Sequence, residues 1–230
     1  MVRKIILITA ITLSFSNVIL SQITPATIID YRRLQMDFDL ENSSIAKEVV
    51  DYEGTPYLLD QFTMADILLK AGEGYKGIPM NYNIYNDDFE FLMDSVSYAL
   101  GNNSIINHIN INGRKFYYLT YTYNAAEIKG YLELVADGKY RFFKKHRVIY
   151  TKPQPPSGYV EAQAAKFSSR SPDYFIELID GNIVYFNNLK DIAEMVPEQG
   201  RNINDYIKDK KLKARREEDI IELADFINGK

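Results

Sequence analysis

Residues 109–120 read ININGRKFYYLT, and this stretch decides how the surrounding chain folds. Asn112-Gly113 is a strong signal for the two-residue turn of a β-hairpin, because both residue types accept the left-handed backbone of a type I′ turn. On either side of it, apolar and aromatic residues alternate with more polar ones, as in an antiparallel sheet with one buried and one solvated face. The alternating set is Ile109, Ile111, Phe116, Tyr118 and Thr120. We therefore predict a hairpin that turns at 112–113.

The same kind of pattern extends along the chain in both directions. Between residues 57 and 150, short runs of tyrosine, phenylalanine, isoleucine and leucine are separated by glycine, asparagine and aspartate. Asp137-Gly138 is a second two-residue hairpin signal. Residues 57–150 are therefore predicted to form an antiparallel β-rich region, arranged as a meander, a sandwich or an open barrel.

The composition changes after this region. Residues 151–172 are rich in proline, serine, glycine, alanine and glutamine, and Pro153, Pro155 and Pro156 cannot donate the hydrogen bonds of a sheet. We therefore expect a linker or a crossing loop over 151–172. A further hairpin is predicted around 180–182, which read Asp-Gly-Asn.

Helical patterns end the chain within residues 173–230. Asn188 is a candidate helix cap, Pro197 stops the first helix, and Gly229 ends the last one. The apolar positions are Leu189, Ile192, Ala193 and Val196 in the first helix, Ile203, Tyr206 and Ile207 in the second, and Ile220, Leu223, Ala224 and Ile227 in the third. The predicted class is α+β, with an antiparallel β-rich N-terminal region followed by a hairpin and a helical C-terminal tail.

Residues 1–21 have the pattern of a cleavable secretory signal peptide. Two basic residues, Arg3 and Lys4, precede an apolar segment, and cleavage is expected between Ser21 and Gln22. The alternative is an uncleaved anchor, but serine and asparagine interrupt the apolar stretch that a membrane-spanning helix would need. The mature protein is therefore expected in the periplasm or outside the cell, with no transmembrane segment.

The overall composition excludes several classes of protein. The chain has 46% hydrophobic and 25% charged residues, which is typical of a globular protein. Removal of Arg3 and Lys4 with the signal peptide takes the formal net charge from −4 to −6, which disfavours general binding of nucleic acid. The absence of cysteine excludes disulfides and thiolate zinc sites. Residues 22–56 form a poorly defined lead-in.

Motifs that carry catalytic chemistry are absent from the sequence. It has no Gly-x-Ser-x-Gly elbow, no glycine-rich phosphate loop and no His-Glu-x-x-His motif. The two histidines, His108 and His146, lie in predicted strands without a carboxylate at ligand spacing, so each is interpreted as an ordinary strand histidine. We predict no catalytic residue, no metal ligand and no cofactor, and find no positive support for an enzyme.

Three charged segments offer alternatives. Residues 86–88, which read Asn-Asp-Asp, and Glu90 supply oxygen atoms for calcium, but their spacing does not match an EF-hand and the same residues are standard turn formers. Basic runs over 144–147 and 208–216 are able to bind anionic glycans or lipid head groups. For the second run we favour a solvated linker, because acidic residues follow it directly.

Tyrosines supply the candidate binding residues. Residues 81–91 are predicted to form a β-hairpin in which Tyr82 points inward while Asn83 and Tyr85 face outward. We select Tyr85, Asn83 and Tyr82 as the binding residues, because a tyrosine ring stacks and its hydroxyl group forms hydrogen bonds. A wider aromatic platform would add Tyr117, Tyr121 and Tyr123, although about half of such rings in a sheet point into its core.

One part of the sequence resembles a known family. Residues 77–91 read GIPMNYNIYNDDFEF, and together with residues 54–58 (GTPYL) they resemble the recurring core of a family of small exported proteins from Bacteroidota. The tail, with Met195-Val196-Pro197 and a basic stretch before Glu217, is also similar to that family. The resemblance covers most of the mature chain and implies export. The family has no assigned activity, so no site residue is transferred from it.

These observations leave two classes of function open. The favoured hypothesis is a non-catalytic envelope protein that binds a protein or a glycan through an exposed aromatic or charged surface. The alternative is a periplasmic or extracellular hydrolase that acts on envelope polymers. A hydrolase would need paired carboxylates, or a nucleophile and a base, in one concave site.

Overall fold

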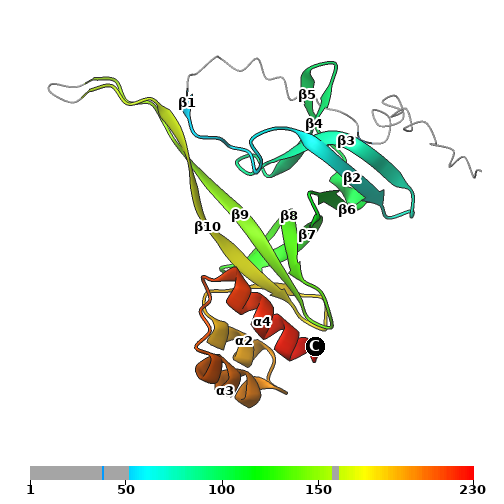
Figure 1. Ribbon diagram of the computed structural model, residues 1–230, viewed down its shortest axis with the longest axis vertical. Helices are drawn as coiled ribbons and strands as arrows, with labels where there is room; N and C mark the ends of the chain where they lie inside the picture. Colours follow the sequence, from blue (N-terminus) through cyan, green and yellow to red (C-terminus); the bar gives the residue numbers. More distant parts are fainter. Residues whose placement is uncertain (1–37, 39–51, 157–160) are drawn as a thin grey trace, which may run out of the picture.

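A computed structural model describes Phe38, residues 52–156 and residues 161–230. The signal peptide expected over 1–21 lies outside the described residues, as does the lead-in expected over 22–56 apart from Phe38 and residues 52–56. Strands prevail in the described chain and three helices follow them, so the predicted α+β class is confirmed (Figure 1). The helices described are all too short or too polar to cross a membrane.

Strands make up 49% of the described chain. Their bounds are β1 (Tyr52–Glu53), β2 (Thr63–Leu69), β3 (Gly74–Asn83), β4 (Asp88–Met93), β5 (Val96–Ala99), β6 (Ile106–Ile111), β7 (Arg114–Tyr123), β8 (Ala126–Ala136), β9 (Arg141–Thr151), β10 (Ala165–Glu177) and β11 (Ile183–Phe186). A short 3₁₀ turn, Asn103–Ile105, precedes β6. The hairpins predicted at 112–113, 137–138 and 180–182 all form, between β6 and β7, β8 and β9, and β10 and β11. Asn112 and Gly113 both have positive φ, as the type I′ turn requires.

All the strands belong to one sheet in the order β1-β10-β9-β8-β7-β6-β2-β3-β4-β5. The last strand, β11, pairs with β10 on one side and with β7 on the other, so β7 to β11 close into a ring. Alternate residues of these strands fill the ring with a core of its own, made of Tyr121, Leu132, Phe143, Phe175 and Ile183. Strands β2 to β6 continue from the ring as an open antiparallel sheet.

The open sheet has a second core, rich in aromatic residues. Tyr82 and Phe89 stack across the β3–β4 pair with ring centroids 5.0 Å apart, and Phe116 and Tyr131 from the ring strands pack against them. Phe38 is fully buried in the same core, 5.9 Å from the ring of Tyr75. This core therefore spans the junction between the open sheet and the ring.

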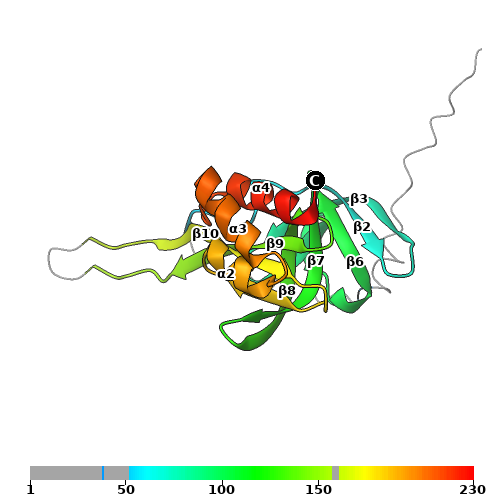
Figure 2. The same cartoon turned by 90° about the horizontal axis from the view of Figure 1, so that it is seen from below.

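The three helices cover one outer face of the ring (Figure 2). They are α2 (Leu189–Met195), α3 (Gly200–Lys210) and α4 (Glu217–Asn228), as the periodicity predicted. Asn188 caps α2 through a capping box with Asp191, and Gly229 ends α4 in the left-handed conformation. Their predicted apolar positions pack on Tyr140, Phe142, Tyr174, Ile176 and Phe186 of the sheet.

The segment over 151–172 differs from the linker or crossing loop that its composition suggested. Strand β9 continues to Thr151, β10 starts at Ala165, and a bridge between Gln154 and Gln163 carries their pairing further outward. The two strands form a long hairpin that projects from the body of the molecule (Figures 1 and 2). The prolines lie near its tip, where the neighbouring backbone needs no donor from them.

One leucine and one isoleucine of α4 test how the C-terminal helices are held on the sheet. Leu223 is fully buried between α4 and the sheet, whereas Ile221 on the same helix is 36% exposed. Leu223→Ala should lower the free energy of unfolding by about 2 to 5 kcal/mol, because it leaves a cavity in the helix–sheet core. Ile221→Ala should change it by less than about 1 kcal/mol. Denaturant unfolding of both variants makes the comparison, and equal effects would contradict the packing of α4 on the ring.

Candidate functional site

The predicted hairpin over 81–91 is present in the structure. Strands β3 and β4 pair through Tyr82 with Phe89 and through Asn83 with Asp88, and residues 84–87 form the turn between them. Tyr85 lies in this turn with 52% of its surface exposed. The turn therefore presents one tyrosine to solvent, as predicted, although Tyr85 lies in the turn and not in the strand whose alternation was expected to direct it.

Tyr85 is part of an aromatic patch, which we define as Tyr52, Tyr85, Tyr150 and Phe167. The ring centroid of Tyr85 lies 5.4 Å from that of Phe167 and 5.9 Å from that of Tyr150. Phe167 in turn lies 4.9 Å from Tyr150 and 5.1 Å from Tyr52. The rings meet in the tilted or edge-on geometry that aromatic pairs favour. Tyr52 is also exposed, so the patch combines solvent-accessible ring faces with rings that support one another.

Strand pairing explains why these four rings meet. Tyr150 and Phe167 are cross-strand partners in the β9–β10 hairpin, and β1 brings Tyr52 alongside β10. Gly54 follows β1 with a positive φ, and a Cβ atom there would overlap the carbonyl oxygen of Phe167. A glycine is therefore needed for the chain to pass β10 at this distance. The sequence pattern missed Tyr52, Tyr150 and Phe167, because no local signal links three distant segments.

Two of the three predicted binding residues are buried. Tyr82 is inaccessible to solvent, as its inward facing predicted, and its hydroxyl group donates to Oδ1 of Asp87 at 2.6 Å. Asn83 was expected to face outward, but it is 4% exposed, and its Nδ2 donates to Oε1 of Glu90 at 2.8 Å. The side-chain Oδ1 of Asn83 also accepts from the backbone N–H of Asn86, and this bond closes the turn. Asn83 and Tyr82 therefore shape the turn, and only Tyr85 is able to contact a partner directly.

The wider tyrosine platform does not form. Tyr117, Tyr121 and Tyr123 are alternate residues of β7 and belong to the core inside the ring. Tyr121 is nearly inaccessible to solvent and lies edge-on to Phe175, with centroids 4.8 Å apart. The rings of β7 therefore stabilise the barrel-like ring, and the exposed aromatic surface lies instead at the base of the long hairpin.

Asp87 holds the β3–β4 turn against the ring strands, and we call this set of contacts the Asp87 anchor. Its Oδ1 accepts from the hydroxyl of Tyr82 and from the backbone N–H of Tyr131, and it forms an ion pair with Nζ of Lys145. A Cβ atom at Gly130 would overlap Oδ2 of Asp87, so the glycine makes room for the carboxylate. Burial lowers the pKa of Lys145, whereas the neighbouring carboxylate of Asp87 favours its charged form.

These contacts argue against the calcium alternative. The carboxylate of Asp87 is occupied by protein donors, and Glu90 accepts from Tyr57, Asn83 and Ser97. Within residues 52–156 and 161–230, histidine and acidic side chains form no group of three or more with metal-binding geometry. Burial raises the pKa of Asp88 to about 7. The residues from Asn86 to Asp88 therefore act as a turn that Asp87 joins to β9 through its ion pair with Lys145.

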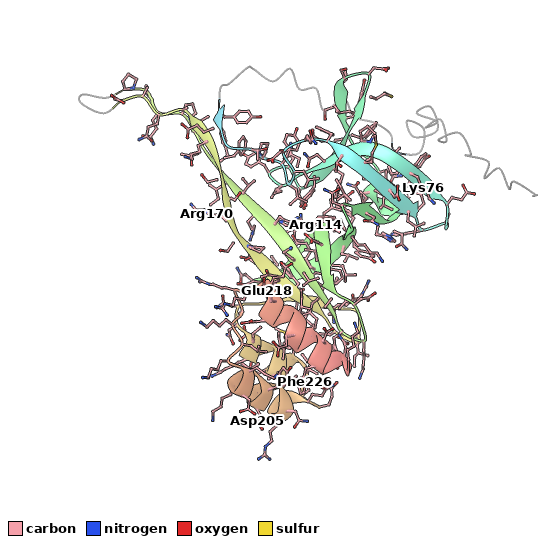
Figure 3. The ribbon with its side chains drawn as sticks, in the orientation of Figure 1. Lys76, Arg114, Arg170, Asp205, Glu218 and Phe226 are labelled. Carbon is pink, nitrogen blue, oxygen red and sulfur yellow. The ribbon has the colours of Figure 1, made fainter. Side chains whose placement is uncertain are left out.

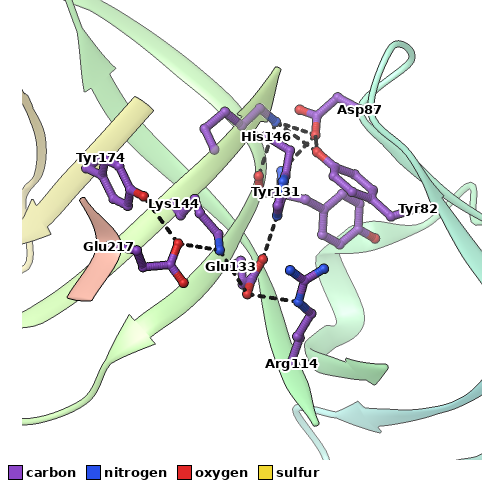
Figure 4. A network of polar contacts seen from close by, with 10 residues as sticks. Tyr82, Asp87, Arg114, Tyr131, Glu133, Lys144, His146, Tyr174 and Glu217 are labelled. Atoms are coloured by element: carbon purple, nitrogen blue, oxygen red, sulfur yellow. Dashed lines mark hydrogen bonds and ion pairs between the residues drawn. The ribbon is translucent and has the colours of Figure 1, made fainter. Parts of the chain in front are cut away.

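A second polar cluster joins the ring to the helices (Figure 4). Oε2 of Glu133 lies 2.5 Å from Nε2 of His146, and Oε1 of Glu133 lies 3.4 Å from Nζ of Lys144 and from Nε of Arg114. Lys144 also donates to Oε2 of Glu217 on α4 at 2.7 Å. Burial alone would raise the pKa of Glu133, but His146, Lys144 and Arg114 together lower it. We call this set the Glu133 cluster.

The cluster corrects two interpretations of the sequence. His146 does have a carboxylate partner, supplied by the neighbouring strand β8 and therefore invisible as sequence spacing. Lys144 and Lys145 are buried in ion pairs, so the basic run over 144–147 is not a binding surface for anions. His108 remains an ordinary strand histidine, 2.8 Å from Oδ1 of Asn107, and burial lowers its pKa.

Comparison with known proteins identifies no relative of this chain: no family model, no curated protein and no solved structure matches it. The buried carboxylate of Glu133 and the partly buried carboxylate of Asp87 are neutralised by cationic partners and serve structure. The aromatic patch is exposed and has no such internal role.

The Asp87 anchor predicts a large loss of stability when one charge is removed. Lys145→Met should lower the free energy of unfolding by about 3 kcal/mol, because it leaves the carboxylate of Asp87 without its ion-pair partner. Lys129→Met replaces an exposed lysine of the adjacent strand and should change it by less than about 0.5 kcal/mol. Asp87→Asn should lower the free energy of unfolding less in the Lys145→Met background than it does in the wild-type protein. Additive effects in this double-mutant cycle would show that the two residues are not coupled.

Proposed function

We propose that the mature chain is an exported, non-catalytic binding module that recognises a protein or a glycan of the cell envelope through the aromatic patch. The observation that supports this proposal is the exposure of Tyr85, at 52% of its surface, within a set of mutually packed rings. Large exposed rings are costly to leave in water and are typical of recognition surfaces. Export is supported by the signal-peptide pattern of residues 1–21 and by the resemblance to exported Bacteroidota proteins.

The support beneath Tyr85 favours binding over a role in packing alone. The turn that carries it is fixed by the Asp87 anchor, and its ring is braced by Tyr150 and Phe167. A ring that is already held in place loses little conformational entropy when it contacts a ligand. Protein hot spots and sugar-binding sites both use tyrosine in this way, since the ring supplies area and the hydroxyl supplies a hydrogen bond.

The hydrolase alternative has less support from the geometry. A hydrolase needs acidic or nucleophilic groups that converge, free of other partners, on a concave site. The two carboxylates closest to that requirement, Glu133 and Glu217, are bridged by the ammonium of Lys144. Their charges are therefore satisfied within the fold.

Tyr85→Ala should abolish capture of the partner while leaving the fold intact. Tagged protein starting at Gln22 is incubated with envelope extract from the native host, and the retained material is divided into protease-sensitive and glycan fractions. The unfolding free energy of Tyr85→Ala should fall by about 1 kcal/mol, as expected for a half-exposed ring. Tyr82→Ala, which removes a fully buried ring, should cost about 3 to 5 kcal/mol.

Met64→Ala is the matched control for this experiment, because Met64 is 67% exposed on β2, away from the patch. Retention of the same material by wild type and Met64→Ala, with its loss in Tyr85→Ala, is the expected result. Capture that survives Tyr85→Ala undiminished would show that the patch is not the binding surface.

Export makes a separate prediction about the N-terminus. Protein recovered from the periplasmic or extracellular fraction should begin near Gln22, because the signal peptide is expected to be cleaved after Ser21. N-terminal sequencing of the fractionated protein measures this directly. An intact start at Met1 in the inner-membrane fraction would show that the segment is an anchor.

A further inference from the structure

A polar pocket lies on another part of β10, and we call it the bulge pocket. Its volume is about 360 Å³, and its walls come from β10, from the end of β11 and from the connection between α3 and α4. The residues that define its chemistry are Arg170, Asp173, Tyr174, Tyr185, Asn187 and Arg215. Figure 3 shows Arg170 on β10 and Glu218 at the start of α4 below it.

An irregularity of the strand creates one wall of this pocket. Strand β10 advances from Arg170 to Asp173 while β9 advances only from Arg147 to Lys145, so β10 carries an extra residue. Such a bulge bends the strand and changes the direction of its side chains, and bulges are common beside binding sites. Ser171 and Pro172 occupy the bulge and line the pocket.

The charges around the pocket are unequal. Asp173 is the one carboxylate among its described lining residues, and its Oδ2 accepts from Nε of Arg147 at 2.6 Å. The hydroxyl of Tyr174 donates to Glu217, which is itself paired with Lys144. Arg170 and Arg215 are both exposed, and neither has an ion-pair partner within the described part of the chain. The pocket is therefore lined by two arginines from separate segments, β10 and the α3–α4 connection, and neither is paired with a carboxylate in the described chain.

We propose that the bulge pocket binds a phosphate monoester group, held between Arg170 and Arg215. Guanidinium groups present paired N–H donors that match the oxygens of phosphate, and their attraction is strongest for a doubly charged anion. A phosphate monoester carries nearly two negative charges at neutral pH, which balances the two arginines. Ser171, Tyr185 and Asn187 also line the pocket, and the hydroxyl of Tyr185 donates to Oδ1 of Asn187. These polar side chains supply contacts for the group that bears the phosphate.

This site goes beyond the proposed function and is independent of it. The bulge pocket shares no residue with the aromatic patch, and one of its two arginines, Arg215, belongs to the basic run over 208–216 that the sequence indicated. Tyr85→Ala should leave phosphate binding unchanged, and substitution of the arginines should leave partner capture through the patch unchanged. The failure of one proposal is therefore distinguishable from the failure of the other.

Titration calorimetry with inorganic phosphate and with glycerol 3-phosphate tests the site, using the mature protein at low ionic strength. Saturable binding is expected with a dissociation constant of about 1 mM or tighter. The double variant Arg170→Ala/Arg215→Ala should weaken it at least tenfold. Arg201→Ala removes an exposed arginine of α3 that does not line the pocket and should leave it unchanged. Because the second proton of a phosphate monoester leaves near about pH 6, affinity should rise between about pH 5 and about pH 8.

Further arms of the experiment identify the source of the phosphate and the result that would overturn the proposal. Stronger binding to phosphatidylcholine vesicles that contain phosphatidic acid than to glycerol 3-phosphate, lost in the double variant, would assign the group to a lipid. Tighter binding of glycerol 3-phosphate would assign it to a soluble ester. Absence of saturable binding to every phosphate probe would overturn the proposal, and so would binding that the double variant retains in full. Equal affinity for glucuronate, a carboxylate with one negative charge, would also overturn it, because the site would then not select phosphate.

Discussion

The carboxylate of Asp87 and the ammonium of Lys145 meet where the β3–β4 turn rests on the ring of β7 to β11. The side chain of Lys145 is nearly buried and that of Asp87 is 28% exposed, and a charge withdrawn from water is stable only when an opposite charge and hydrogen-bond donors accompany it. The missing side chain of Gly130 allows the approach, and Tyr82 and the backbone of Tyr131 complete it. The same contact that joins the open sheet to the ring therefore sets the position of the turn that carries Tyr85.

The helices depend on a similar arrangement at the other end of the ring. Apolar packing supplies most of the contact, but the Glu133 cluster adds a chain of charges that runs from the strands to Glu217 on α4. Asn228 adds a second link, since its amide group donates to and accepts from the backbone of Tyr140. Without disulfides, the chain relies on packing for stability and on these polar contacts to specify how its layers are oriented.

Strand β10 relates the two proposed recognition surfaces. Its outer part pairs Phe167 with Tyr150 in the aromatic patch, and the bulge after Arg170 forms a wall of the pocket. One surface offers aromatic rings and the other offers guanidinium groups, so their ligands differ in chemistry. The β9–β10 hairpin positions both, because its pairing holds Phe167 beside Tyr150 and its bulge shapes the pocket.

Local sequence determined the turns and the helices of this protein. The Asn112-Gly113 turn, the Asn188 cap and the apolar face of α4 all follow from residues within a few positions of one another. The exposure of Tyr85 was predicted, but strand alternation does not explain it, because Tyr85 lies in the turn after β3 and Asn83, on the same predicted face, is buried. Tertiary structure alone decided that Lys144 and Lys145 are buried and that Tyr52, Tyr150 and Phe167 meet Tyr85. Burial and contact depend on which distant strands become neighbours, and the pairing that closes the ring has no local sequence signal.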